Sequence, residues 1–345
     1  MMKEENSEEA LGYREHQAVA NSDLKYLHSP RLFKAHKDGL LPATSSPHQN
    51  FGTWFEDFLT LSEQEFNDIY IVEPVWGEGE KPNSPNKENF VQWYLTNGDI
   101  YEAYLNSYKV SNKDIDNGIY KTKANDLYES LKRYITFIKE AQNKVPIDAK
   151  SFSTLVVMKD NILNDVAYNN MMDSKGKEII HQLEIGVNFP VTHYGINWKG
   201  KLDWLILDHV NCIAYVVDLK TTSSPISFFH YEVNKYKYYR QIALYRILVE
   251  AYLDQRNLHG WTIATRFVAV ETTGINEAAV IPIPFNMLKV GYQELEEAAE
   301  TIKWHYANGW NTRRSQANNN GLLLLDWTSL YSYQEANKTE TELEE

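Results

Sequence analysis

The stretch that decides the fold class of this chain is Gly200-Lys201-Leu202-Asp203, followed by Val216-Val217-Asp218-Leu219-Lys220-Thr221-Thr222. The apolar runs 202–207 and 213–219 are joined by a short polar turn, which predicts two adjacent antiparallel strands. Asp203 and Asp218 are then neighbours, and Asp218 and Lys220 leave the same face of their strand. Two adjacent carboxylates in an apolar sheet repel each other unless a cation lies between them. The pattern therefore predicts a divalent metal site.

A helical stretch downstream carries Gln241 and Tyr245. Three elements therefore follow one another in order: Gly-x-x-Asp, then Asp-x-Lys about fifteen residues later, then a helix with Gln-x-x-x-Tyr. This ordered set resembles the PD-(D/E)XK nuclease superfamily. The likeness is strongest to the RecB-like and exonuclease VIII-like branch, and it covers residues 184–261 well. It implies an α/β fold with a restriction-endonuclease-like core, a mixed β-sheet flanked by helices, and a helical N-terminal lobe.

The resemblance assigns the chemistry of the site to a small group of residues. Asp203 and Asp218 are implied as ligands of one or two Mg²⁺ or Mn²⁺ ions, together with the backbone carbonyl of Leu219. Lys220 and Gln241 are implied as catalytic residues beside them. A lysine acts as a base near neutral pH only if burial lowers its pKa, whereas nearby carboxylates raise it. An electrostatic role for Lys220 is therefore the favoured interpretation.

A further metal ligand is implied in residues 52–59, whose apolar spacing predicts a helix. The family normally carries a histidine ligand where this chain has Glu56. A carboxylate oxygen suits Mg²⁺ at least as well as an imidazole nitrogen does. The alternative interpretation is a glutamate that faces solvent beside Asp57.

Substrate contacts are implied for two regions around the motif. The strand expected at 179–189 carries Glu184, and the long helix expected at 231–253 presents Tyr238 and Tyr245 on the same face as Gln241. The implied substrate-binding residues are Glu184, Thr221, Lys235, Tyr238, Arg240 and Tyr245. The alternatives are a solvated strand glutamate and an amphipathic helix whose tyrosines only pack their rings.

The chain order predicts four segments. Residues 1–12 form an acidic disordered N-terminus, and residues 331–345 form an acidic tail. Residues 13–175 form the helical lobe, with helices at 121–142 and 152–172, and residues 176–330 form the nuclease core. Within the lobe, the Pro-, Gly- and Asn-rich loop 73–89 should hold no regular element. Its Trp76 is either a core anchor or a base-stacking platform, and the anchor is favoured.

Composition limits the class of protein further. Of the 345 residues, 43% are apolar, which is enough for a substantial core. The single cysteine, Cys212, forms neither an internal disulfide nor a four-cysteine iron-sulfur cluster, so no such cluster is expected. The chain lacks a long apolar window and a signal-peptide pattern, which predicts a cytoplasmic protein with no membrane association. The formal charge of -13 lies largely in the acidic ends and leaves room for a local basic channel.

The resemblance implies a phage or prophage exonuclease that resects duplex DNA ends beside a single-strand annealing protein and closes into a homo-oligomeric ring. One alternative is a structure-dependent or restriction-type endonuclease. Another is a nuclease-fold protein that binds DNA or a partner without cutting. The intact set of Asp203, Asp218, Lys220 and Gln241 speaks against the non-cutting alternative.

Overall fold

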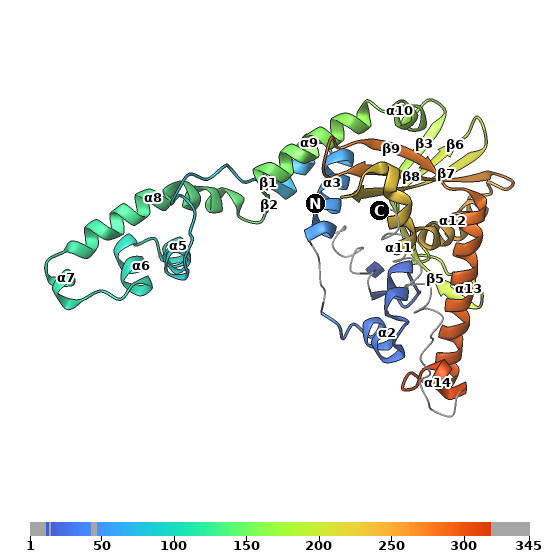
Figure 1. Cartoon of the computed structure of the whole chain (residues 1–345), viewed down its shortest axis with the longest axis horizontal. Coiled ribbons are helices and arrows are strands. Elements are labelled where there is room, and N and C mark those ends of the chain that lie inside the picture. Colours follow the sequence, from blue (N-terminus) through green and yellow to red (C-terminus); the bar gives the residue numbers. More distant parts are fainter. Residues whose placement is uncertain (1–11, 14, 43–46, 319–345) are drawn as a thin grey trace, which may run out of the picture. The chain divides into compact units, whose positions relative to one another are not determined.

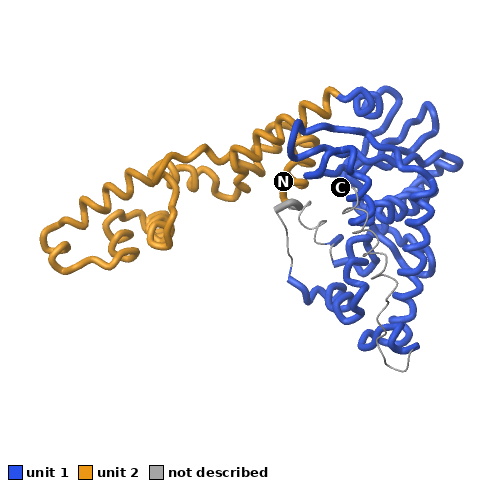
Figure 2. The backbone as a smooth tube through the Cα atoms, in the orientation of Figure 1, with its two compact units in different colours: residues 1–45, 165–345 blue, residues 46–164 orange. Residues whose placement is uncertain are grey.

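The computed structural model describes residues 12–13, 15–42 and 47–318 (Figure 1). It divides into two units (Figure 2). The sheet unit contains residues 1–45 and 165–345 as far as they are described, and the helical unit contains residues 46–164. The acidic tail, and the acidic N-terminus apart from Gly12, lie outside the described residues. Among the described residues, no helix combines the length and the apolar character needed to cross a membrane.

The sheet unit is built on a mixed five-stranded sheet in the order β3-β6-β7-β8-β9. Its strands are β3 Lys177–Ile185, β6 Gly200–Asp208, β7 Ile213–Thr222, β8 Thr262–Glu271 and β9 Ala278–Pro282. Only the β7–β8 pair is parallel, and the other pairs are antiparallel. The predicted antiparallel pair of strands is confirmed, with Trp204 opposite Val217. Two short strands, β4 Val191–His193 and β5 Ile196–Trp198, form a separate antiparallel pair.

Helices cover both faces of the sheet, as the fold class predicts. A parallel β7–β8 pair requires a crossover connection, and here it contains η2 Ile226–Phe228, α11 Phe229–Lys235 and α12 Tyr238–Gln255. The buried residues of α12, among them Leu244 and Leu248, pack with Leu205 and Val216 of β6 and β7. On the opposite face, the ring of Trp204 contacts Tyr168 of α10 Val166–Met172.

A second layer, α13 Phe285–Asn308, packs on α12. The two helices approach closely at Gly291, where a Cβ atom would lie 2.6 Å from the Tyr239 carbonyl oxygen and 2.7 Å from the Ala243 Cβ. Any larger residue would force the helices apart, so glycine sets their separation here. This packing fixes α12 from the side that faces away from the sheet.

The expectation of one long helix at 231–253 is wrong, because α11 ends at Lys235 and α12 begins at Tyr238. Lys237 adopts a left-handed backbone conformation with φ of 55°, which is uncommon for a residue with a side chain. Contacts on both sides hold the break. The Lys237 ammonium binds Glu294 of α13 at 3.0 Å, and the Tyr236 and Tyr238 rings stack with centroids 5.5 Å apart.

The helix expected at 152–172 is also interrupted. It consists of α9 Ala149–Leu163 and α10 Val166–Met172. Asp165 ends the continuity because its carboxylate accepts a hydrogen bond from the Tyr168 backbone N–H at 2.6 Å, the usual arrangement of an N-cap. The break coincides with the boundary between the two units.

The helical unit contains α3 to α9 and a short parallel pair of strands. Its remaining elements are α3 Pro47–Thr60, α4 Glu63–Ile69, β1 Tyr70–Val72, α5 Pro85–Asn97, α6 Ile100–Ser107, α7 Asn112–Asp116, α8 Ile119–Ala141 and β2 Val145–Ile147. The expectation that 73–89 holds no regular element is wrong for its last residues, because α5 begins at Pro85. Ser84 caps this helix by accepting the Lys87 N–H, and proline suits the first helical position.

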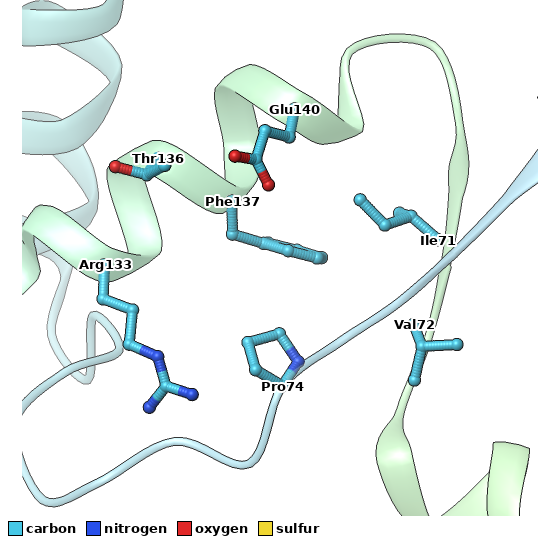
Figure 3. A pocket seen from close by; sticks show the side chains of 7 residues that line it. All are labelled: Ile71, Val72, Pro74, Arg133, Thr136, Phe137 and Glu140. Carbon is cyan, nitrogen blue, oxygen red and sulfur yellow. The ribbon is translucent and has the colours of Figure 1, made fainter.

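Trp76 in this loop packs as a core residue would. Its ring makes edge contacts with Tyr134 and Phe137 of α8, with centroids 5.4 and 5.6 Å apart. A hollow of about 460 Å³ lies in the same unit, with Pro74, Arg133 and Phe137 in its lining (Figure 3).

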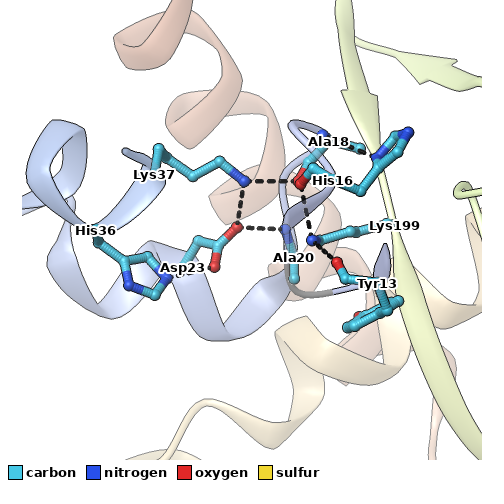
Figure 4. Close-up of polar contacts among 8 residues, drawn as sticks. All are labelled: Tyr13, His16, Ala18, Ala20, Asp23, His36, Lys37 and Lys199. Atoms are coloured by element: carbon cyan, nitrogen blue, oxygen red, sulfur yellow. Dashed lines mark hydrogen bonds and ion pairs between the residues drawn. The ribbon is translucent and has the colours of Figure 1, made fainter. Parts of the chain in front are cut away.

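The chain just before η1 Asn21–Tyr26 and α2 Pro30–Lys37 is bound at Val19 to residues 197–199. Lys199 is only 3% exposed, and its ammonium donates to the backbone carbonyls of Tyr13 and His16 (Figure 4). Burial and the Lys37 charge lower the pKa of Lys199 to about 8, against the opposing charges of Asp23 and Glu184. The buried Asp23 in turn accepts hydrogen bonds from Ala20 N–H and Lys37.

We predict that Lys199→Met changes how the stability of the protein varies with pH. Lys199 has a pKa of about 8 in the folded state, below the unfolded value of about 10.4. Between these values the unfolded state binds more protons, so the contribution of Lys199 to stability rises with pH. Urea unfolding measured at about pH 7.5 and at about pH 9.5 should show that the free energy of unfolding of the wild type rises, relative to that of the variant, from the lower to the higher pH.

The exposed Lys289 provides the control, because Lys289→Met should follow the wild type at both pH values. A difference between wild type and Lys199→Met that stays constant with pH would show that Lys199 keeps an ordinary pKa.

Candidate active site

The two motif carboxylates lie where the β6–β7 ladder ends. Trp204 opposite Val217 is the last regular pair at this end, so Asp203 and Asp218 occupy the next positions. Asp218 continues the buried row of Ala214 and Val216 on the face covered by α12, and it is completely buried. Asp203 is half-buried and accepts the backbone N–H of Leu219 through Oδ2 at 2.6 Å. The structure therefore brings the two predicted carboxylates together on one face of the sheet.

Lys220 forms an ion pair with Asp218 through Nζ and Oδ2, and its side chain is 15% exposed. Burial would lower the pKa of Lys220, but the charges of Asp218 and Asp203 outweigh it and raise this pKa. Burial raises the pKa of the Asp218 carboxyl, and the neighbouring ammonium opposes that shift. A lysine with a raised pKa carries a charge at neutral pH and is a poor general base. The geometry thus supports the electrostatic interpretation of Lys220.

Gln241 connects α12 to the carboxylates. Its Nε2 donates to Oδ1 of Asp218 at 3.0 Å and to the Tyr245 hydroxyl at 2.9 Å. The Tyr245 hydroxyl donates to the carbonyl of Lys201 at 2.7 Å. Burial and the nearby Asp218 and Asp203 raise the pKa of Tyr245, which keeps its hydroxyl protonated as a donor. The chain of hydrogen bonds fixes Asp218 against β6.

The glycine of Gly-x-x-Asp has a packing role in this arrangement. A Cβ atom on Gly200 would lie 2.9 Å from Cε1 of Tyr245 and 2.6 Å from Cδ1 of Leu248. Only glycine lets α12 come close enough for the Tyr245 hydroxyl to reach the backbone of β6. The motif spacing therefore serves the helix contact as well as the carboxylate.

Tyr238 lies on the other side of the lysine. The Lys220 ammonium is 4.8 Å from the centroid of its ring, within the range of a cation–π contact. Burial, opposed by Lys220, raises the pKa of Tyr238 to about 12. The predicted grouping of Tyr238, Gln241 and Tyr245 around the Asp-x-Lys residues is present in the structure.

The other expected substrate-binding residues divide into two groups. Glu184 lies opposite Lys201 across the β3–β6 pair, with Oε1 3.8 Å from Nζ, and so shares the face of Asp203. Thr221 is adjacent to Lys220 in β7, so its side chain leaves the opposite face. The structure thus keeps Glu184 near the carboxylates and separates Thr221 from them.

Arg240 and Lys235 have partners within the chain. The Arg240 guanidinium donates to Asn21 at 2.9 Å and to Glu294 at 3.3 Å, and its side chain is 13% exposed. These contacts join α12 to η1 and α13, so an intramolecular role accounts for Arg240. Lys235 lies at the end of α11 with its ammonium 5.1 Å from the Tyr236 ring centroid. Glu56 is half-buried on α3 of the helical unit, and its role as a ligand stays a prediction.

Sequence reasoning missed the residues that hold the loop after β7. The buried Glu271 lies opposite Thr222 at the end of β8 and accepts the Ile226 N–H at 2.7 Å. Thr222 contacts Glu232 of α11 at 2.6 Å through its hydroxyl. The sequence did point to Thr222, because it is the last residue of the motif. It did not point to Glu271, which is distant from Thr222 in the chain.

The donor atoms at this site suit a hard cation. Oδ1 of Asp218 accepts the Gln241 amide, and Oδ2 of Asp218 is paired with the Lys220 ammonium. Among the described residues, no cluster of three or more His, Cys, Asp or Glu side chains forms a metal site. Mg²⁺ is commonly held by one or two carboxylates, with water and substrate phosphate as its other ligands. Asp203 and Asp218 fit that pattern of coordination.

A mixed sheet that carries Asp203, Asp218 and Lys220 on one face, with Gln241 reaching them from the crossover helix, defines the PD-(D/E)XK nuclease superfamily. The chain belongs to the family described as PDDEXK-like domain of unknown function (DUF3799), whose model matches residues 29–317. The predicted superfamily is therefore confirmed.

Two further comparisons accompany this family assignment. Among curated proteins, none matches the chain. Among solved structures, the chain is similar to the crystal structure of a "Putative exonuclease" from Eubacterium rectale. The sequence identity is 14% and the TM-score is 0.36, and the match covers 83% of this chain and 96% of that chain.

Proposed function

We propose that the protein is a metal-dependent deoxyribonuclease that hydrolyses phosphodiester bonds from the ends of duplex DNA. The observation that carries the proposal is the fully buried Asp218, paired with Lys220 and held by Gln241 beside Asp203. Burying a carboxylate and an ammonium costs free energy that apolar residues of similar size would avoid. Such groups with shifted pKa values cluster at functional sites, and the family supplies the nuclease context.

Each residue has a defined task in this proposal. Asp203 and Asp218, with the Leu219 carbonyl and Glu56, would hold one or two Mg²⁺ or Mn²⁺ ions. A divalent ion bound there supplies an activated water and stabilises negative charge on the phosphate. Lys220 orients the attacking water and opposes the charge that develops on the phosphate oxygens. Gln241 keeps Asp218 in position.

Contacts to the DNA backbone complete the proposed site. In this proposal Glu184, Lys235, Tyr238 and Tyr245 contact the substrate beside the carboxylates, and burial raises the pKa of Tyr238 to about 12, so its hydroxyl remains a hydrogen-bond donor also at alkaline pH. We also propose, from the resemblance alone, that the enzyme acts in the cytoplasm in phage or prophage recombination. A single-strand annealing protein as partner and a homo-oligomeric ring belong to the same proposal.

We predict that the protein degrades end-labelled linear duplex DNA with added Mg²⁺ and leaves closed circular duplex intact. Asp218→Asn and Lys220→Met should each reduce the rate by at least about a hundredfold, and the double variant should lose little more, since both residues act on one phosphate. The exposed Asp254 gives the control, because Asp254→Asn should keep wild-type activity.

Each other result of this digestion has a clear meaning. Cleavage of the circle identifies an endonuclease, and DNA binding without any cleavage identifies a non-cutting protein. Turnover by Asp218→Asn at the wild-type rate, or cleavage in excess EDTA, contradicts the catalytic assignment.

We predict that Glu56→Ala raises the Mg²⁺ concentration needed for half-maximal activity by about 10- to 100-fold, because one ligand is lost. Glu56→His should recover activity more with Mn²⁺ than with Mg²⁺, since imidazole is a softer ligand than carboxylate. The measurement is a metal titration of the cleavage rate, with Glu63→Ala as the exposed control. Unchanged metal dependence in Glu56→Ala would identify Glu56 as a surface residue.

A further inference from the structure

Three aromatic side chains lie exposed directly after the strand that carries Asp218 and Lys220. Phe228, Tyr231 and Tyr236 are 52%, 65% and 51% exposed, and we name them the aromatic platform. Phe228 and Tyr231 stack with centroids 6.2 Å apart and an angle of 28° between their planes. Large apolar groups gathered on a surface usually mark a binding site. Among the described residues, no packing covers these rings, and they form a candidate binding surface.

The platform is presented by a firmly held segment. Phe228, Tyr231 and Lys235 are spaced at i, i+3 and i+7, which places them on one side of α11 and the turn before it. Glu271 holds the start of this segment through Ile226 N–H, and Glu232 holds α11 through Thr222. A segment supported in this way holds its backbone in place before any ligand binds, which lowers the entropic cost of binding.

One ring of the platform, Tyr236, is linked to the proposed catalytic residues. The Tyr236 ring stacks on Tyr238 with centroids 5.5 Å apart, and Tyr238 lies under the Lys220 ammonium at 4.8 Å. Lys235 is 5.1 Å from the Tyr236 ring centroid, which adds a positive charge beside the exposed rings. A ligand that stacks on Tyr236 would therefore lie close to Tyr238 and Lys220.

Flat aromatic faces beside ammonium groups are the usual means of binding single-stranded nucleic acid. Bases stack on the rings whatever their identity, and the cations contact the phosphates. Bases inside a duplex already stack on one another, so unpaired bases present free faces that internal base pairs do not. An apolar protein segment would bury the rings equally well, but it would gain less from the adjacent Lys235 and from the route to the active site.

We propose that the aromatic platform binds the unpaired bases of a DNA strand that enters or leaves the active site. This inference rests on the proposed function only in taking DNA as the ligand. The site thereby gains a preference for frayed or single-stranded ends, without a preference for base sequence.

The test measures binding in excess EDTA, so that it does not depend on cleavage. The probes are a fluorescent single-stranded oligonucleotide, the same strand with abasic sites in place of its bases, and a blunt duplex. The wild type should bind the normal strand at least about tenfold more tightly than the abasic strand, since stacking contributes about 1–3 kcal/mol per base. Phe228→Ala, Tyr231→Ala and Tyr236→Ala should each weaken binding of the normal strand by about tenfold and leave the abasic strand unaffected.

Tyr306, which is 61% exposed on α13, gives the matched control, because Tyr306→Ala should bind as the wild type does. Equal affinity for the normal and abasic strands, or wild-type binding by all three variants, overturns the proposal and leaves the platform free for a protein partner. Base-dependent binding without cleavage by the wild type would contradict only the nuclease assignment, and cleavage without base-dependent binding would contradict only the platform.

Discussion

The ion pair between Asp218 and Lys220 is the interaction on which the rest of the structure depends. A carboxylate without solvent contact is stable only if neighbouring groups compensate for the hydration it has lost. Here the compensation comes from the Lys220 ammonium in the same strand and from the Gln241 amide, whose Nε2 lies 3.0 Å from Oδ1 of Asp218. The end of β7 carries charged side chains on its buried face, so the helix that covers this face must place polar groups opposite them. The α12 helix does so with Gln241.

That requirement explains the construction of the helical layer. Gly200 lets α12 approach β6, and Gly291 lets α13 approach α12, so both contacts fix the height of Gln241 above the sheet. Tyr245 then satisfies the Lys201 carbonyl while it holds the Gln241 amide. The break at Lys237 lets α11 run in a direction different from that of α12, and the exposed rings of the aromatic platform lie on and around α11. Fold and site are therefore parts of one packing arrangement.

The sequence was sufficient to predict the features that depend on local periodicity. The β6–β7 pair, the shared face of Asp218 and Lys220, and the face of α12 with Gln241 and Tyr245 follow from periods of two and about 3.6 residues. The start of α5 was also readable, because Ser84-Pro85 is a helix-start pattern inside a loop-like composition. The Pro-, Gly- and Asn-rich composition of the preceding residues masks this local signal.

Tertiary contacts decided the features that could not be predicted. The break at Lys237 is held by Glu294, and Arg240 is paired with Asn21 and Glu294, both far away in the chain. Glu271, which holds the loop after β7, becomes a neighbour of Thr222 only through the parallel β7–β8 register. A single sequence contains no local record of such pairings.

We propose that the buried Asp218–Lys220 pair is part of a metal-binding active site and not a structural ion pair alone. Thermal unfolding with Mn²⁺ and with EDTA, for the wild type and Asp218→Asn, tests it most directly. A ligand that binds only the folded protein stabilises it by about 2.7 kcal/mol at one hundred times its dissociation constant. We predict that saturating Mn²⁺ raises the Tm of the wild type and leaves that of Asp218→Asn unchanged. Equal Tm shifts in both proteins, or no shift in the wild type, would contradict the claim.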